Sequence, residues 1–222
     1  MFLKGEMMFT AIIPIRRRDG QLEIADCNNF SLLERKIKSL KKVDYVSEII
    51  IASNSLEIKE YVSSFGLEFY FRAEEEVQDN PEFFIGNIVK TIKNQHVIWT
   101  SCMNPFIDEK IFYEAINDFL NLDLSVYDSL IACGKLDKFI LDENGPLNFK
   151  TGHYHVNSRS LPELYYLVNG CFIIDRDLMA KCKYQWGKTP YKKILNSIST
   201  FEIKNEDDFL FFKEVLDKKE NL

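Results

Sequence analysis

Short apolar segments alternate with amphipathic segments along the first half of the chain, and this alternation constrains the fold more than any other feature. Buried strands are expected at residues 9–15, 47–52 and 67–71, where bulky apolar residues follow one another without polar alternation. Between them, residues 30–43 place apolar side chains at helical spacing, with Lys and Arg on the opposite face. Residues 56–65 are expected to form a second helix, capped by Ser53-Asn54-Ser55 and ended by Gly66. This β-α-β-α-β order predicts a parallel sheet with right-handed crossovers.

The second half continues the pattern around one irregular stretch. Further strands are expected at 96–100, 129–133, 169–175 and 198–203, and further helices at 81–92, 108–120, 177–181 and 207–218. Residues 134–164 are polar and contain Gly145-Pro146 and Gly152, so residues 134–168 are expected to form an arm inserted into a single domain of residues 1–222. We therefore predict an α/β three-layer sandwich with a mostly parallel central sheet.

Charge and cysteine content exclude several classes of partner and location. The formal net charge of −6 argues against a broad nucleic-acid surface, which needs clustered Lys and Arg. No apolar run reaches the roughly 18 residues of a membrane span, and residues 1–8 lack the apolar core of a signal peptide. The five cysteines are scattered without a C-x-x-C pair, which indicates reduced thiols. We expect a cytoplasmic protein with no nucleic-acid or membrane partner.

Candidate ligand-binding residues follow the expected strands, because open α/β sheets bind ligands at the carboxyl ends of their strands. Arg16, Arg17 and Arg18 follow the first strand and could bind a polyphosphate, or could project into water. Arg72 ends the third strand and could point at a ligand or pair with the acidic residues 74–76. Asn104 follows the fourth strand, where a turn would offer polar groups to a ligand or serve only as a connection.

Fewer residues suggest a metal site or an acceptor site. Glu202, at the end of the expected last strand, could bind a hard divalent cation such as Mg²⁺, whereas Asp207 and Asp208 are expected to open the last helix. Arg159, in the irregular arm, could contact an anionic substrate. The chain lacks a Walker A loop, a dinucleotide fingerprint and a G-x-S-x-G elbow, so these three chemistries are not expected.

Six segments, in order, resemble the acylneuraminate cytidylyltransferase family, which activates sialic and related acidic sugars with CTP. They are AIIPIR, IIIASNSLEIKEYVSSFG, FYFRAEEEVQDNPEFF, MNPF, SRSLPELYYLVNGCFII and FEIKNEDDF, and they span nearly the whole chain. The family's corresponding motifs are IIPAR, VIVSTDSEEIAEVAKKYG, an Arg followed by an acidic run, TSPL or TSPF, RQDLPxxYxxNGAxYI and DIDTEEDF.

The resemblance implies a nucleotide-diphospho-sugar transferase-like fold, a homodimer formed through the arm, and transfer of CMP from CTP to a sugar with release of pyrophosphate. By position, Arg16 matches a phosphate contact and Arg72 an arginine near the nucleotide. Ser101 falls where the family has a sugar-contacting Gln, and Asn169 and Gly170 match the pair beside the acceptor. Magnesium would bridge the triphosphate.

Two departures from the family pattern leave a second hypothesis open. The first loop has Arg17 and Arg18 in place of glycines and lacks the family's Lys, and the DID metal motif becomes Glu202-Ile203-Lys204. Under the first hypothesis, the three arginines supply the missing positive charge and Glu202 contacts the metal. Under the second, the chain is a non-catalytic nucleotide-binding or partner paralogue. We favour the enzyme.

Overall fold

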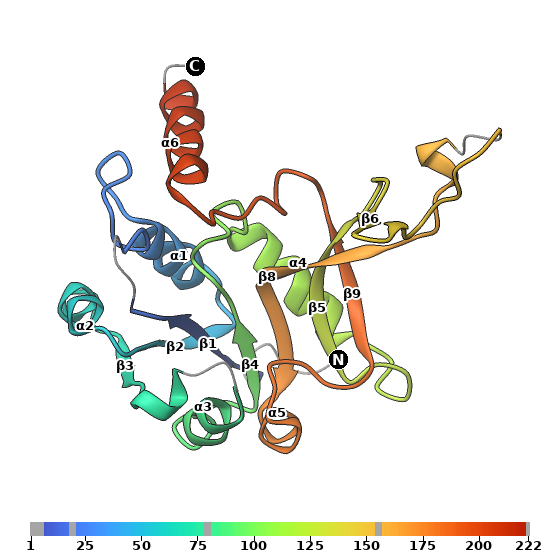
Figure 1. The fold of residues 1–222 in the computed structure, drawn as a ribbon. Helices are drawn as coiled ribbons and strands as arrows, with labels where there is room; N and C mark the ends of the chain where they lie inside the picture. The colour runs from blue at the N-terminus through green and yellow to red at the C-terminus, as the bar shows by residue number, and fades with distance from the viewer. Residues whose placement is uncertain (1–6, 18–20, 78–80, 154–156, 221–222) are drawn as a thin grey trace.

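A seven-stranded sheet forms the centre of the computed structural model, which describes residues 7–17, 21–77, 81–153 and 157–220 (Figure 1). The strand order is β3-β2-β1-β4-β8-β5-β9, and β8 runs antiparallel to its neighbours while the other pairs are parallel. The strands are β1 (Phe9–Ile15), β2 (Val46–Ser53), β3 (Glu68–Phe71), β4 (His96–Trp99), β5 (Ser129–Lys135), β8 (Tyr165–Asp175) and β9 (Pro190–Leu195). The sheet is mostly parallel, as predicted.

Helices cover both faces of the sheet. They are α1 (Leu32–Lys41), α2 (Leu56–Ser63), α3 (Pro81–Ile88), α4 (Glu109–Leu120), α5 (Arg176–Cys182) and α6 (Glu206–Glu220). Side chains of α1, α2, α4 and α6 join one buried apolar cluster, and those of α3 and α5 join another. Neighbouring residues of β1 divide between the two, since Ile13 belongs to the first cluster and Ile12 to the second. This confirms the three-layer α/β sandwich.

The helices begin and end where the sequence supplies caps. Ser31 and Ser55 accept hydrogen bonds from the third amides of α1 and α2 (3.0 and 3.4 Å), and Asp108 does the same for α4 (3.2 Å). Gly66 follows α2 with a φ of 65°, a left-handed conformation that glycine adopts without strain. The strands β1, β2, β3 and β4 pair in parallel, so their carboxyl ends lie at one edge of the sheet.

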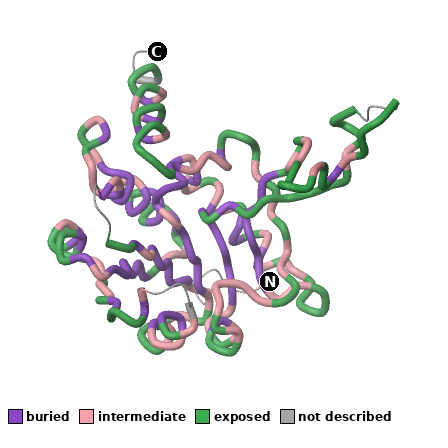
Figure 2. Tube along the Cα trace, viewed as in Figure 1, coloured by how far each residue is buried: buried purple, intermediate pink, exposed green. Residues whose placement is uncertain are grey.

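The chain leaves the sheet after β5 and returns in β8. This segment carries a two-stranded hairpin of β6 (Leu141–Asp142) and β7 (Gly145–Pro146), and then a 3₁₀ turn at Ser158–Ser160. It projects from the body and is largely exposed (Figures 1 and 2). All five cysteines are free. Within the described part of the chain, no helix is long and apolar enough to cross a membrane.

Candidate functional site

The loops after β1 and β2 are joined at the carboxyl edge of the sheet. The amide of Arg17 donates to Asn54 Oδ1 (2.8 Å), and Gln21 Nε2 donates to the carbonyl of Arg16 (3.1 Å). The side chains of Arg16 and Arg17 are exposed, and Arg18 lies outside the described residues. The backbone after β1 is thus held across the ends of β1 and β2, with two of the three predicted arginines beside it.

Arg72 is buried at the end of β3. It is 4% exposed, and its guanidinium lies 3.9 Å from the centre of the Phe84 ring. One terminal nitrogen donates to the main-chain carbonyl of Glu76, while Nε has no hydrogen-bond partner among the described residues. A buried donor without a partner costs free energy in the ligand-free protein.

The surroundings of Arg72 disfavour its positive charge. Burial and, to a smaller extent, the positive charge of Arg16 lower the pKa of its guanidinium to about 10, although Glu76 and Tyr70 act in the opposite direction. The two arginines are therefore close enough to repel each other. An anion bound between them would relieve this repulsion and stabilise both cations.

The acidic run after Arg72 divides into a buried and an exposed part. Glu76 is 2% exposed, and its carboxylate accepts hydrogen bonds from the Tyr70 hydroxyl (2.7 Å), the Asn87 side chain (2.7 Å) and the amide of Ala73 (2.9 Å). These three donors occupy the carboxylate, so Glu76 offers Arg72 its main-chain oxygen instead. Ligand contact by Arg72 stays a prediction.

A hollow of about 530 Å³ opens beside these residues. It is lined by Asn54, Phe71, Arg72, Glu74 and Val77. The ring of Phe71 is 51% exposed and supplies an apolar wall, while Asn54 and Arg72 supply polar groups. Apolar surface combined with a few polar groups at strand ends is typical of a small-molecule site.

A second group of predicted residues meets at the turn after β4. Asn104 is fully buried, and its Nδ2 donates to the carbonyl of Phe201 (3.3 Å), while its Oδ1 has no hydrogen-bond partner in the described structure. The amide of Ile203 donates to the carbonyl of Met103 (2.8 Å). These two bonds attach the segment that carries Glu202 to this turn.

Gly170 lets β8 approach the same turn. A Cβ atom at position 170 would lie 2.0 Å from Ile107 Cδ1 and 3.0 Å from Asn104 Cβ, so a larger residue would displace the turn. The buried hydroxyl of Thr100 donates to the carbonyl of Gly170 (2.6 Å). Asn169 is exposed beside it, and Ser101 Oγ accepts from the amide of Met103 (3.1 Å). The structure thus joins Ser101, Asn104 and Gly170.

Glu202 is paired with a cation. Lys204 Nζ lies 3.6 Å from Glu202 Oε2, and the two side chains are 71% and 24% exposed. Within the described ranges, no group of three or more His, Cys, Asp or Glu residues could hold a metal. Because Mg²⁺ can bind through one carboxylate together with substrate phosphates, the donors fit a metal carried by a nucleotide better than a site built by protein alone.

Two sequence expectations differ from the structure near this site. The strand expected at 198–203 is wrong, because Asn196 Oδ1 accepts from the amides of Ile198 (3.0 Å) and Ser199 (2.9 Å) and closes a turn there. The edge strand is β9, just before it. Arg159 lies in the 3₁₀ turn of the projecting segment, where its side chain is exposed. The segment that carries this turn projects away from the sheet (Figure 1).

Two cations on α1 were not recognised from the sequence as part of this region. Lys36, expected on the solvent face of its helix, is 2% exposed and donates to the carbonyls of Asn104 (3.0 Å) and Ile107 (2.6 Å). Arg35 Nε donates to the carbonyl of Pro105 (3.0 Å). The available signal was the position of Lys36, three residues after Leu33 and four before Leu40, within the apolar stripe.

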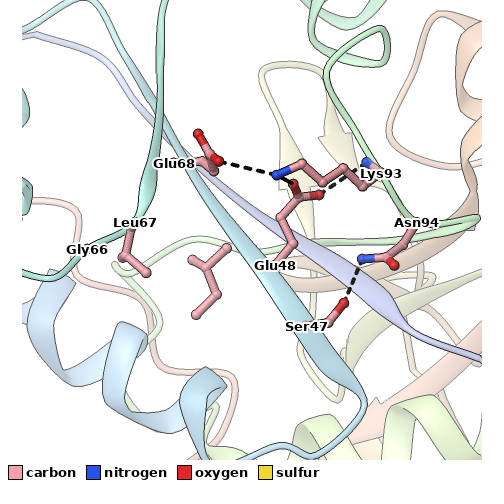
Figure 3. A pocket seen from close by; sticks show the side chains of 8 residues that line it. Ser47, Glu48, Gly66, Leu67, Glu68, Lys93 and Asn94 are labelled. Carbon is pink, nitrogen blue, oxygen red and sulfur yellow. Dashed lines mark hydrogen bonds and ion pairs between the residues drawn. The ribbon is translucent and has the colours of Figure 1, made fainter. Parts of the chain in front are cut away.

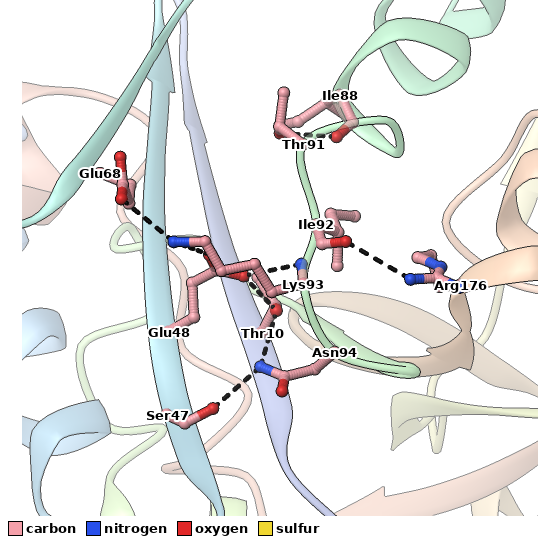
Figure 4. A network of polar contacts seen from close by, with 10 residues as sticks. All are labelled: Thr10, Ser47, Glu48, Glu68, Ile88, Thr91, Ile92, Lys93, Asn94 and Arg176. Carbon is pink, nitrogen blue, oxygen red and sulfur yellow. Dashed lines mark hydrogen bonds and ion pairs between the residues drawn. The ribbon is translucent and has the colours of Figure 1, made fainter.

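A different hollow, of about 340 Å³, lies at the amino edge of the sheet (Figure 3). Here Glu48 Oε2 accepts from the Thr10 hydroxyl (2.6 Å) and the amide of Lys93 (3.2 Å), and Lys93 Nζ lies 3.2 Å from both Glu48 Oε1 and Glu68 Oε1. Asn94 Nδ2 joins Thr10 (3.0 Å) to Ser47 (2.9 Å), as Figure 4 shows. These groups bind one another and tie three strands together.

A family model identifies the chain. The model described as cytidylyltransferase matches residues 23–144, which is more than half of the 222 residues. The chain belongs to the cytidylyltransferase family. The match begins within the loop between β1 and α1 and includes β2, β3, the buried Arg72 and the Asn104 turn. Membership in the acylneuraminate branch is a finer assignment than this model makes.

Solved structures share the fold at low sequence identity. The CTP complex of CMP:2-keto-3-deoxy-manno-octonic acid synthetase has a TM-score of 0.70 at 10% identity, over 96% of this chain and 99% of that one. The 4-diphosphocytidyl-2C-methyl-D-erythritol synthase from Anaerococcus prevotii has a TM-score of 0.66 at 16% identity, over 95% and 98%. Another synthase of that name has a TM-score of 0.70 at 7% identity, over 95% and 99%. No curated protein sequence matches at a significant level.

Proposed function

We propose that the chain transfers CMP from CTP to a hydroxyl of an acidic, nonulosonic acid-like sugar and releases pyrophosphate. Family membership supports the use of CTP. Two arginines carry the site: Arg16 follows β1, and Arg72, at the end of β3, is buried with an Nε that has no hydrogen-bond partner among the described residues. They lie where an open α/β sheet binds its ligand, and Arg72 lines the hollow of about 530 Å³.

In this proposal, the triphosphate lies along the backbone after β1. Arg16, Arg17 and Arg18 bind its oxygens, and Arg72 and Asn104 hold the nucleotide from the neighbouring strand ends. The acceptor oxygen attacks the α-phosphorus, the bond from that phosphorus to the bridging oxygen breaks, and pyrophosphate takes the electron pair while the hydroxyl proton passes to solvent. The arginines stabilise the charge that develops on the leaving group.

Mg²⁺ would enter with the triphosphate rather than occupy a site made by carboxylates. Glu202 is the one residue for which we propose metal contact, and Lys204 beside it balances its charge until the nucleotide arrives. The metal would shield the charges of the phosphate oxygens. The residues of the chain orient the nucleotide and the acceptor.

Ser101, Asn169 and Gly170 are proposed to form the acceptor site, because β8 and the Asn104 turn meet there. Arg159 projects away on the arm, so we propose that it reaches the acceptor of a second copy in a homodimer. The exposed Leu141, Leu147 and Leu167 on and near the arm support such an interface, since burial in a dimer would remove them from water. Free thiols fit a cytoplasmic location.

Calorimetry with CTP and Mg²⁺ tests nucleotide binding, and pyrophosphate release tests turnover with 2-keto-3-deoxy-manno-octonic acid, a nonulosonic acid and a polyol phosphate. We expect micromolar-to-millimolar CTP binding and release with an acidic sugar. Arg16→Ala should weaken CTP binding, and Arg176→Ala is its matched control because Arg176 pairs with Asp177 at the opposite edge of the sheet. A wild-type chain that binds no CTP would contradict the proposal.

A second candidate function is a non-catalytic partner that binds the nucleotide without turnover. The ion pair between Lys204 and Glu202 favours it, because the family's metal motif has carboxylates at both positions. CTP binding without pyrophosphate release across the acceptors would support this function. Pyrophosphate release by the wild-type chain would exclude it.

A further inference from the structure

Lys36 is a buried cation in a position that packing alone would give to an apolar residue. It lies on the face of α1 that also carries the buried Leu33, Ile37 and Leu40, and its side chain is among the largest fully buried ones. Its ammonium lies 5.2 Å from the centre of the Phe112 ring on α4. Burying an ammonium costs free energy unless polar groups accept its hydrogen bonds. Its partners therefore indicate what it does.

Those partners are main-chain carbonyls of the turn between β4 and α4. Lys36 Nζ donates to the carbonyl oxygens of Asn104 (3.0 Å) and Ile107 (2.6 Å), and neighbouring Arg35 Nε donates to that of Pro105 (3.0 Å). Three carbonyls of one short turn are thus held by two consecutive residues of α1. Buried carbonyls need donors, and charged donors make stronger bonds than neutral ones.

The turn that Lys36 holds also carries the residues of the candidate site. Its Asn104 contacts the Gly170 region and donates to the carbonyl of Phe201 (3.3 Å), and its Met103 carbonyl accepts from the amide of Ile203 (2.8 Å). A shift of the turn would therefore move Asn104 and the segment with Glu202 together. Lys36 itself is buried and touches no part of the hollow.

The groups around Lys36 act on its charge in opposite directions. Burial lowers the pKa of its ammonium to about 8, with a smaller lowering from Arg35, while Cys102, Cys171 and Asp108 raise it. Burial thus opposes the charge of Lys36, and the hydrogen bonds to the carbonyls of Asn104 and Ile107 receive its donors. The chain keeps a buried charge that an apolar residue of similar length would avoid.

We infer that Lys36 is a positioning residue of the CTP site, whose ammonium fixes the 104–107 turn and thereby sets Asn104 and Glu202 for the nucleotide. This inference rests on the proposed function. It does not make Lys36 catalytic, because its ammonium contacts main-chain carbonyls rather than substrate. Arg35 supports the same turn from the surface side of α1.

The test compares Lys36→Met, Lys36→Arg and the control Lys193→Met by CTP calorimetry with Mg²⁺ and by amide hydrogen exchange. Lys193, on β9, has a 12% exposed side chain that pairs with Asp118 (2.6 Å) on α4, so its loss removes a largely buried lysine whose ammonium is held by a carboxylate rather than by the carbonyls of the turn. We expect Lys36→Met to raise the Kd for CTP about tenfold. This is the lower end of the loss in affinity that follows when a residue that supports a ligand-binding residue is removed. Lys36→Arg should restore most of the affinity, and Lys193→Met should leave it unchanged.

Hydrogen exchange separates this inference from the proposed function, since it needs no nucleotide. We expect the amides of Met103, Ile107 and Ile203 to exchange faster in Lys36→Met but not in Lys193→Met, even if wild-type protein binds no CTP. If Lys36→Met binds CTP as tightly as wild type, or leaves these three amides unchanged, the inference is overturned. Should Lys36→Met not fold, Lys36→Gln, which keeps a neutral donor, carries the same comparison.

Discussion

The two edges of the central sheet use their polar side chains in different ways. At the amino edge, the carboxylate of Glu48 is engaged by Thr10 and by the amide and ammonium of Lys93. At the carboxyl edge, the buried Arg72 Nε and Asn104 Oδ1 have no hydrogen-bond partner among the described residues. The corresponding atoms at the amino edge are His96 Nδ1 and Glu48 Oε1, and the latter lies 3.2 Å from the ammonium of Lys93. Polar groups that satisfy one another stabilise the fold, whereas buried groups with unused bonding capacity are poised for a ligand.

Hollow size alone does not distinguish the two edges. Both have open hollows, of about 340 Å³ at the amino edge and about 530 Å³ at the carboxyl edge. In the first, hydrogen bonds of Lys93 to Glu48 and Glu68 raise the pKa of its ammonium, so its charge is already matched. In the second, burial and Arg16 lower the pKa of Arg72. An anion gains more by binding beside a buried cation whose charge its surroundings disfavour.

The largest expected effect is on nucleotide binding at the carboxyl edge. Arg72→Met should raise the Kd for CTP on the order of 100-fold, because it removes a charged donor worth about 2–3 kcal/mol. The free energy of unfolding should change less, since the lost bond to the Glu76 carbonyl and the lost contact with Phe84 are offset in part by removal of a buried charge with an unpartnered Nε. Calorimetry and urea unfolding measure the two quantities, with Arg176→Met as the control. A large loss of stability with unchanged CTP affinity would show that Arg72 stabilises the fold and does not bind CTP. The two edges of the sheet would then not differ in function.

At the amino edge, we expect the opposite result. Glu48→Ala leaves the Thr10 hydroxyl and the Lys93 amide without their acceptor, so the free energy of unfolding should fall by about 2 kcal/mol. CTP affinity should stay within about twofold of wild type, since this edge lies across the sheet from the candidate site. Glu68→Ala is the matched control, because Glu68 is an exposed partner of the same Lys93 and should cost less than about 1 kcal/mol. Weakened CTP binding in Glu48→Ala would show that the two edges are coupled.

The smallest effect is expected at Lys204. Lys204→Met removes the cation 3.6 Å from Glu202, so CTP should bind more weakly without Mg²⁺ and regain affinity with it. Because Lys204 is exposed, the ratio of the Kd for CTP without Mg²⁺ to the Kd with Mg²⁺ should change by less than about fivefold. Titrating CTP with and without Mg²⁺ measures it. An unchanged ratio would remove Glu202 from the proposed metal contact.

The layered fold could be predicted because its signals are local. Strand β1 is an unbroken apolar run, and α1, α2 and α4 combine apolar spacing with capping residues. Strand β9 was missed because its Lys192 and Lys193 interrupt the apolar pattern, as charged residues commonly do on edge strands. The strand expected at 198–203 failed because Asn196 closes a turn with its own side chain.

The sequence by itself determined the alternating strands and helices from β1 to β5, the mostly parallel α/β fold and the resemblance to cytidylyltransferases, because each depends on residues near one another in the chain. Only the tertiary structure decided that Arg72 is buried beside Arg16, that Asn104 meets Gly170, and that Lys36 turns inward to hold carbonyls 68 and 71 residues away. The physical reason is that burial and pairing of charges depend on which distant segments the sheet brings together, and a helical pattern does not report what its polar residues will face.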